Sequence, residues 1–419
     1  MNNRIKFIVV CSALMLSFSF GASAQENPCD KLYNGDFVPN YRSTDLTKLK
    51  LAIDSGKKFV EQCASEEGYK EPIEFVRKRL PDMEKKYNLG SAIERFNDAV
   101  KDSKNVKVDQ AFSSGKEILT IEPKFASSLD VMLTLASVGL DQALLNNKKY
   151  SNETLDYAKR AIEQLEANAP SKDYGLWGFI YKTKEFPDGR DNALAWMNYT
   201  IGYILYHHQG KKKDALPYFY KAIQYNSNVK KRPDVYQAIG DYYREEYNRL
   251  DDERIETAKR AQEETNEELK KQLIEKAKNI LALQKGYAER MMDAYARARS
   301  LAVNDKLYQD SLYETIKVLY GVRFDGKKDG VDQYISSLIS KPMPDPTTPV
   351  NPVIETPADT ANVKTVGENQ PVVESNQIAQ VSSATMGKLV SDATNNATAK
   401  LAVNGKSKLS KTAPRGRKN

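Results

Sequence analysis

Apolar residues recur at intervals of three and four along most of the chain, which is the spacing of one face of an α-helix. The spacing is regular over residues 46–63, 73–87 and 93–100. The apolar positions in these stretches are Leu46, Leu49, Ile53, Phe59 and Cys63, then Ile73, Val76, Leu80, Met83 and Tyr87, then Ile93, Phe96, Ala99 and Val100. No stretch alternates apolar and polar residues convincingly enough to predict a β-strand. The pattern therefore predicts an all-α fold.

Small and large residues also repeat in a fixed order between residues 195 and 300. The first copy consists of Ile201, Gly202, Leu205, Ala215, Phe219 and Ala222, with one extra residue in the turn around Gly210. The second copy consists of Tyr236, Ile239, Gly240 and Tyr243, followed much later by Met291, Tyr295 and Ala298. This order resembles the tetratricopeptide repeat (TPR), a pair of helices that touch at small residues.

The resemblance implies a TPR-like solenoid of helical hairpins over residues 106–340, with weaker matches on both sides of the two clear copies. Other solenoids of paired helices share this spacing, and they remain an alternative. In the TPR family the first helix of each repeat lines a concave groove that binds a partner. The resemblance places on this groove Trp196, Tyr199, Tyr203, Tyr206 and His207, and then Asp234, Gln237, Asp241 and Arg244.

Two states of this groove are consistent with the sequence. Aromatic residues between the repeats could pack onto the groove and fill it; they are Tyr174, Trp177, Phe179, Tyr181 and Phe186. If the groove is open, aromatic rings with one polar edge suit an extended peptide or a glycan. The sequence does not decide between the two.

The second copy departs from the family because its two helices are separated by about forty surplus residues. These residues are strong helix formers, and apolar positions with coiled-coil spacing continue through them. We therefore expect an antiparallel coiled-coil insertion at about residues 247–287 that reverses near Thr265 and Asn266. Such an arm would project about 28 Å. It could serve only to rigidify its neighbours, or it could dock or dimerise.

Both ends of the chain differ in composition from the middle. Residues 1–24 have a basic start, an apolar run and a final Ala22-Ser23-Ala24, which predicts a cleaved signal peptide, with an uncleaved anchor as the alternative. Residues 25–105 are expected to form an N-terminal helical region. Residues 341–419 contain many Pro, Thr and Asn residues and no aromatic residue, which predicts a disordered tail.

Removal of the signal peptide would leave two cysteines, Cys29 and Cys63. In an exported protein an even number of cysteines favours a disulfide, and this one would be worth about 3–4 kcal/mol. A metal site lacks ligands, because the two histidines of the chain are adjacent and no third ligand lies at a suitable spacing. We therefore expect no metal and no cofactor.

The net charge of +7 is concentrated at the C-terminus, where residues 388–419 contain eight Lys or Arg and one acid, Asp392. The rest of the mature chain is nearly neutral, so no nucleic acid partner is expected. No phosphate-binding loop, nucleophile motif or metalloprotease motif occurs in the sequence. Together these observations predict a protein that is not an enzyme.

The sequence therefore predicts a periplasmic or extracellular adaptor that binds a protein or peptide partner through the groove and the arm. The alternative is an envelope-associated structural protein whose basic tail binds an acidic cell-surface polymer. No membrane span is expected after signal cleavage. We expect a monomer, because an arm with limbs of similar length can close on itself.

Overall fold

The computed structural model describes residues 27–353, which form helices and turns with no β-strand among them. The all-α prediction is confirmed. The expected signal peptide, residues 1–24, and residues 354–419 of the expected tail lie outside the described part. The chain divides into two compact units, one up to Ala92 and one from Ile93.

The first unit is built from helices around an aromatic core. Its elements are α1 (Pro28–Asp30), the π-helical turn η1 (Lys31–Phe37), α2 (Leu46–Gln62), the 3₁₀ turn η2 (Glu67–Tyr69) and the first part of α3 (Lys70–Val100). Phe37 and Phe59 are fully buried, and Tyr33 stacks on both of them. A disulfide joins Cys29 to Cys63, with a Cα–Cα distance of 6.0 Å, and so ties the start of this unit to the end of α2.

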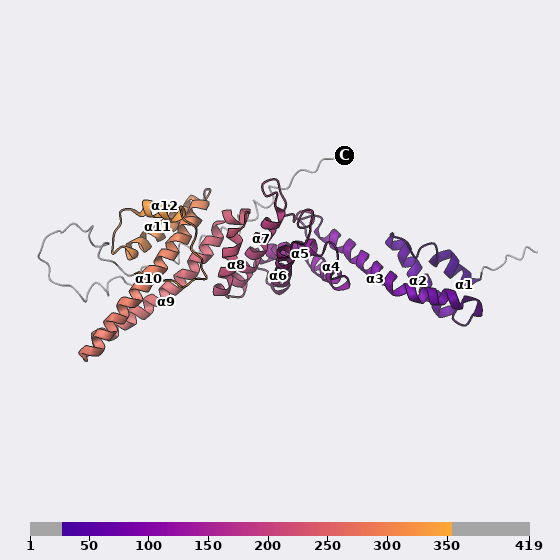
Figure 1. Ribbon diagram of the computed structural model, residues 1–419, viewed down its shortest axis with the longest axis horizontal. Helices are drawn as coiled ribbons and strands as arrows, with labels where there is room; N and C mark the ends of the chain where they lie inside the picture. The colour runs from indigo at the N-terminus through magenta and orange to yellow at the C-terminus, as the bar shows by residue number, and fades with distance from the viewer. Residues whose placement is uncertain (1–26, 354–419) are drawn as a thin grey trace, which may run out of the picture. The chain divides into compact units, whose positions relative to one another are not determined.

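The second unit begins inside α3, which is earlier than the boundary expected after residue 105. The reason is that the end of α3 bonds to the next segment of the chain. Arg95 pairs with Glu117 at 2.6 Å, and the Lys107 amide donates to the Ala99 carbonyl. The helices of this unit succeed one another along the chain in Figure 1. They are α4 (Val108–Ile121), α5 (Ser128–Leu144), α6 (Ser151–Glu166), α7 (Gly189–Tyr203), α8 (Lys212–Gln224), α9 (Pro233–Glu263), α10 (Glu267–Leu301), α11 (Lys306–Arg323) and α12 (Val331–Ile339).

Paired helices approach closely at glycines. A Cβ atom on Gly202 of α7 would lie 2.7 Å from the ring of Phe219 on α8, and one on Gly240 of α9 would lie 2.5 Å from the ring of Tyr295 on α10. In the preceding pair, a Cβ atom on Gly139 of α5 would collide with Thr154 of α6. Three consecutive helical hairpins thus share one mode of contact, which requires the absence of a side chain on the first helix.

The first repeat copy has one residue more than the TPR pattern, and the sequence places this residue near Gly210. In the structure the additional residue is accommodated before Gly210, in the π-helical turn η3 (Ile204–His208) that follows α7. A π turn accommodates one more residue than an α turn without breaking the helix. Two candidate residues, Tyr206 and His207, lie on η3 rather than on a regular α-helix. Their side chains therefore point in other directions than a continued α-helix would give them.

Helices α9 and α10 form the predicted antiparallel hairpin, and they lie side by side along their length (Figure 1). The chain reverses at residues 264–266, where the Asn266 side chain caps α10 by accepting from the Glu268 and Leu269 amides. The seam between the limbs is buried as expected at ten apolar positions: Tyr243, Tyr247, Leu250, Ala261, Leu273, Ala277, Ile280, Met291, Ala294 and Ala298. Tyr287 and Leu301 are only half-buried.

The seam also contains a buried polar layer. Arg254 is 6% exposed and donates to the Gln284 Oε1 atom at 3.0 Å and to the Asp251 Oδ1 atom at 2.8 Å. Gln284 donates in turn to Asp251 at 3.0 Å. Since each group has a partner, the layer avoids the large penalty of an unpaired buried charge.

The expected disorder of the tail from residue 341 is wrong for its first part. Residues 341–353, called the strap below, lie against α8 and α10, with Met343 only 8% exposed. The composition misled the prediction because most of the strap's contacts use backbone carbonyls, which composition does not reveal.

Replacing both Cys29 and Cys63 by serine should destabilise the first unit by about 3 kcal/mol, because the disulfide restricts the unfolded chain. Faster amide exchange in α2, followed by mass spectrometry, would report the loss. Trp177 and Trp196 both lie in the second unit, so the tryptophan fluorescence transition in urea should not move. Unchanged exchange in α2 would contradict the expected contribution.

Gly202→Ala should lower the free energy of unfolding by about 1–3 kcal/mol, because the new methyl group would enter the space of the Phe219 ring. Gly321→Ala in α11 is the matched control, since its Cβ would meet only the Lys327 carbonyl at 3.9 Å. There the higher helix propensity of alanine should stabilise by up to about 1 kcal/mol. Urea unfolding followed by circular dichroism should give opposite signs for the two variants.

Candidate partner-binding surface

The candidate groove residues lie on α7, η3 and α9, and we call these nine side chains the α7–α9 face. They differ in exposure. Trp196, Tyr199, Tyr206 and Gln237 are buried, whereas Tyr203, Asp234, Asp241 and Arg244 are half-buried and His207 is exposed. Part of the face therefore belongs to the core, and only part of it is available to a ligand.

At the α7 end of this face, the polar edges of the buried aromatic residues are bonded within the protein. The Tyr199 hydroxyl donates to Asp234 at 2.6 Å and accepts from Arg232 at 3.0 Å. The Trp196 indole donates to Asn228 at 2.8 Å. These two rings act mainly in packing.

Charge pairing stabilises this cluster electrostatically. Arg232 binds both carboxylate oxygens of Asp234, at 3.0 and 2.8 Å, and its guanidinium lies 4.7 Å from the centre of the Tyr199 ring. Burial alone would raise the pKa of Asp234, but the charge of Arg232 and the hydrogen bonds from Arg232 and Tyr199 together outweigh burial and hold that pKa below its ordinary value. Burial raises the pKa of Tyr199 well above its ordinary value, so the phenol stays protonated and can donate.

The polar residues of α9 connect it to the next two helices. Gln237 accepts from the Tyr308 hydroxyl of α11 at 2.7 Å, and Asp241 accepts from the Tyr295 hydroxyl of α10 at 2.9 Å. Arg244 lies 3.4 Å from Asp241. Burial raises the pKa of Asp241, and Arg244 and Tyr295 oppose that rise. The polar continuation expected from the sequence is therefore largely used between helices.

An aromatic cluster at the end of α7 is partly accessible, because Tyr203 is half-buried and His207 is exposed, whereas Tyr206 is buried. The His207 ring lies 4.4 Å from the Tyr203 ring and 4.9 Å from the Tyr206 ring, measured between centres. Desolvation by the packed rings lowers the pKa of His207, so the imidazole is neutral at pH 7. The Lys212 ammonium lies 5.3 Å from the centre of the Tyr206 ring and pairs with Glu245.

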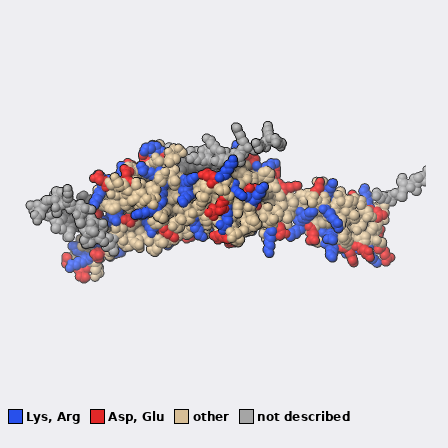
Figure 2. Space-filling model, turned by 45° about the horizontal axis from the view of Figure 1, so that its top comes forward, with Lys and Arg blue, Asp and Glu red and all other residues tan. Residues whose placement is uncertain are grey.

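A shallow hollow of about 460 Å³ adjoins this cluster. It is lined by Gly210, Lys211, Lys212, Lys213, Asp214 and Glu245. Three consecutive lysines beside three aromatic rings suit a peptide segment that presents a carboxylate and an apolar side chain. Figure 2 shows acidic and basic side chains interspersed over one face of the molecule. The lining of the hollow is itself mixed in charge, since Asp214 and Glu245 accompany the three lysines.

The corresponding face of α5 is covered by the loop that precedes α7. Asp130 accepts from the Ser171 hydroxyl at 2.6 Å and from the Gly175 amide at 2.9 Å. One and two turns further along α5, Thr134 accepts from the Leu176 amide, and Ser137 shares a hydrogen bond with Tyr181. Of the aromatic residues considered as filling, Tyr181 and Phe186 are buried, whereas Trp177 is 50% exposed and bonds to Asn97.

The cover on α5 ends before Asp141, which lies one helical turn beyond Ser137 on the same face. Asp141 is half-buried, and among the described residues burial is the only influence on the pKa of its carboxyl group. Burial raises its pKa to about 6. Sequence reasoning missed this residue, because an aspartate near the end of a helix has no distinguishing pattern.

Other residues of the site were also missed. Arg232 organises the buried aromatic cluster, and Tyr308 fixes Gln237, although neither belongs to the repeat pattern. In the part of the chain that the structure describes, no three His, Cys, Asp or Glu side chains form a metal-binding group. Within residues 27–353, no helix has both the length and the apolar composition needed to cross a membrane.

No protein-family model, curated protein or solved structure matches this chain.

Asp141→Asn should stabilise the protein by about 2 kcal/mol at pH 8 and have little effect at pH 4. With a folded pKa raised to about 6, the carboxyl is neutral in the folded state at pH 4 but is a buried charge at pH 8. The stability that the neutral acid contributes is therefore lost as pH rises through 6. Urea unfolding at both pH values measures the difference. Asp252→Asn, at an exposed aspartate of α9, should show no such dependence on pH.

Proposed function

We propose that the protein is an exported adaptor, without catalytic activity of its own, that binds another protein through a TPR-like array and its helical arm. The array is supported by the glycine contacts of the three hairpins α5/α6, α7/α8 and α9/α10. The TPR resemblance implies that paired helices touch each other at small residues. The signal-like sequence of residues 1–24 supports export to the periplasm or the extracellular space.

The observation that carries this proposal is an apolar stripe on the arm. Ile255 is 38% exposed and Ile274 is 37% exposed, while Leu281 is half-buried. Each of the three directly follows a seam residue, namely Arg254, Leu273 and Ile280. In an antiparallel pair, positions that follow the seam residues lie on the same side of both limbs. The arm closes on its own seam and still presents these apolar side chains, as an interaction surface does.

The aromatic cluster of Tyr203, Tyr206 and His207 is the second contact in the proposal. It spans the end of α7 and η3, next to the lysine-lined hollow, and its accessible members are Tyr203 and His207. We propose that it receives an extended segment of the same partner, while the filled face of α5 contributes only to stability.

The charge of residues 388–419 supports a second candidate, attachment to an acidic cell-surface polymer. This segment lies outside the described residues, and it has eight basic residues against Asp392. This role is favoured if the protein stays bound to envelope material at low salt, is released at high salt, and no longer binds when residues 388–419 are removed.

The adaptor is tested by placing a photo-crosslinking amino acid at single positions of the full chain in its native compartment. Positions 255 and 274 should give a discrete cross-linked partner. Position 269 is the matched control, because Leu269 is 43% exposed on the same arm but precedes a seam residue by four and so lies on the other side.

A double variant with Ile255→Ser and Ile274→Ser should capture this partner at least tenfold more weakly, whereas Leu269→Ser should leave capture unchanged. Equal cross-linking at 269 and 274 would show that the stripe is not a specific surface. Absence of any cross-linked partner at both 255 and 274 would contradict the adaptor.

A further inference from the structure

The strap lies in a trough on α10 that is shaped for a backbone rather than for side chains. A Cβ atom on Gly286 would lie only 2.2 Å from the carbonyl oxygen of Asn351 and 3.0 Å from Val350. The missing side chain also leaves the backbone of α10 accessible, and the Val353 amide donates to the Ala282 carbonyl at 2.8 Å. Gly286 is therefore the floor of the trough.

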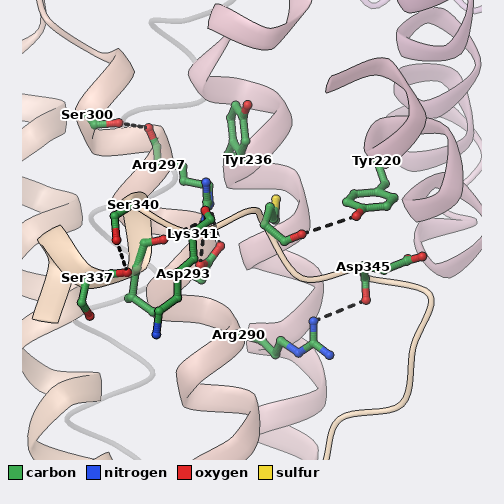
Figure 3. A network of polar contacts seen from close by, with 12 residues as sticks. Tyr220, Tyr236, Arg290, Asp293, Arg297, Ser300, Ser337, Ser340, Lys341 and Asp345 are labelled. Atoms are coloured by element: carbon green, nitrogen blue, oxygen red, sulfur yellow. Dashed lines mark hydrogen bonds and ion pairs between the residues drawn. The ribbon is translucent and has the colours of Figure 1, made fainter. Parts of the chain in front are cut away.

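Fixed donors line the trough and point at the strap (Figure 3). The buried Asp293 holds Arg297 through two contacts of 2.7 and 3.1 Å. Arg297 then donates to the carbonyls of Leu338 and Lys341, at 2.9 and 2.7 Å. Because Asp293 orients the guanidinium, little side-chain entropy is lost when a chain binds there.

Two further donors continue the row. The Tyr220 hydroxyl of α8 donates to the Met343 carbonyl at 3.4 Å. Arg290 donates to the Asp345 carbonyl at 3.4 Å and to the Thr348 hydroxyl at 3.0 Å. The strap thus presents one carbonyl after another to arginine and tyrosine donors on two helices.

The sequence of the strap suits this row of donors. Each of the carbonyls of Lys341, Met343 and Asp345 precedes a proline. Proline keeps the chain extended and has no N–H group, so every second residue from 342 to 346 brings no backbone donor to a surface that itself consists of donors. Only Met343 and Pro346 are buried. The contacts therefore select an extended chain of Xaa-Pro units with one apolar anchor, and not this particular sequence.

We propose that the trough formed by Tyr220, Gly286, Arg290 and Arg297 is a binding site for an extended, proline-rich segment of a partner protein. The strap is its resident occupant, which such a segment displaces. Tethering gives the strap a high effective concentration, so a partner segment must be abundant or tight-binding to replace it. This site is separate from the arm stripe and does not depend on the adaptor proposal.

The test uses a fluorescein-labelled peptide of residues 341–353 and the full-length chain. In one variant, Gly and Ser replace all of residues 341–353, which empties the trough. Fluorescence anisotropy should show that this variant binds the peptide at least tenfold more tightly than the native chain does, and that a peptide whose five prolines are replaced by alanine does not bind. Adding Gly286→Ala should weaken binding at least tenfold, whereas adding Gly321→Ala should not change it.

The proposal is overturned if the folded replacement variant does not bind the peptide, if the peptide with alanine in place of its prolines binds equally well, or if the native chain binds as tightly as the variant. Should the replacement variant lose its helical circular dichroism, the native chain decides. A large excess of unlabelled peptide should then increase hydrogen exchange at the Val353 amide of the chain. No increase would exclude displacement of the strap.

Discussion

The contact between Gly240 and Tyr295 is the constraint on which the second half of the molecule depends. It brings α9 against α10, and α10 in turn supports α11, α12 and the strap. The Tyr295 ring is fully buried, and its hydroxyl binds Asp241. One residue thus sets both the separation of the two helices and their rotation about their axes. A bulkier residue at 240 would disturb every element that α10 carries.

Polar groups inside the array serve mainly to align helices. The clusters around Asp234 and Asp241 each satisfy a half-buried carboxylate with donors from a neighbouring element. Buried polar groups of this kind contribute little net stability compared with apolar packing, but they are costly to misplace. They favour one arrangement of α7, α9 and α11 over others with equally well buried apolar faces.

The sequence predicted the helices, the arm and its turn because these depend on local periodicity. Seam residues such as Leu273 and Ile280 are recognisable from their spacing alone. The extent to which the α7–α9 face is available was not predictable. Whether Tyr199 is core or surface depends on Arg232, and the cover over α5 depends on Ser171 and Tyr181, whose positions result from tertiary packing. The strap was missed for the same reason: its anchors belong to α8 and α10.

The polar layer of Arg254, Gln284 and Asp251 has a mechanical consequence for the arm. If one limb slid past the other by a turn, the apolar seam residues would find similar neighbours, but Arg254 and Asp251, which both lie on α9, would lose the side-chain amide of Gln284 on α10 and leave buried polar groups without this partner. Sliding is therefore penalised far more than small bending. A force applied near Asn266 would therefore tilt both limbs together as one rigid body about the base of the arm. The two limbs would not shear past each other.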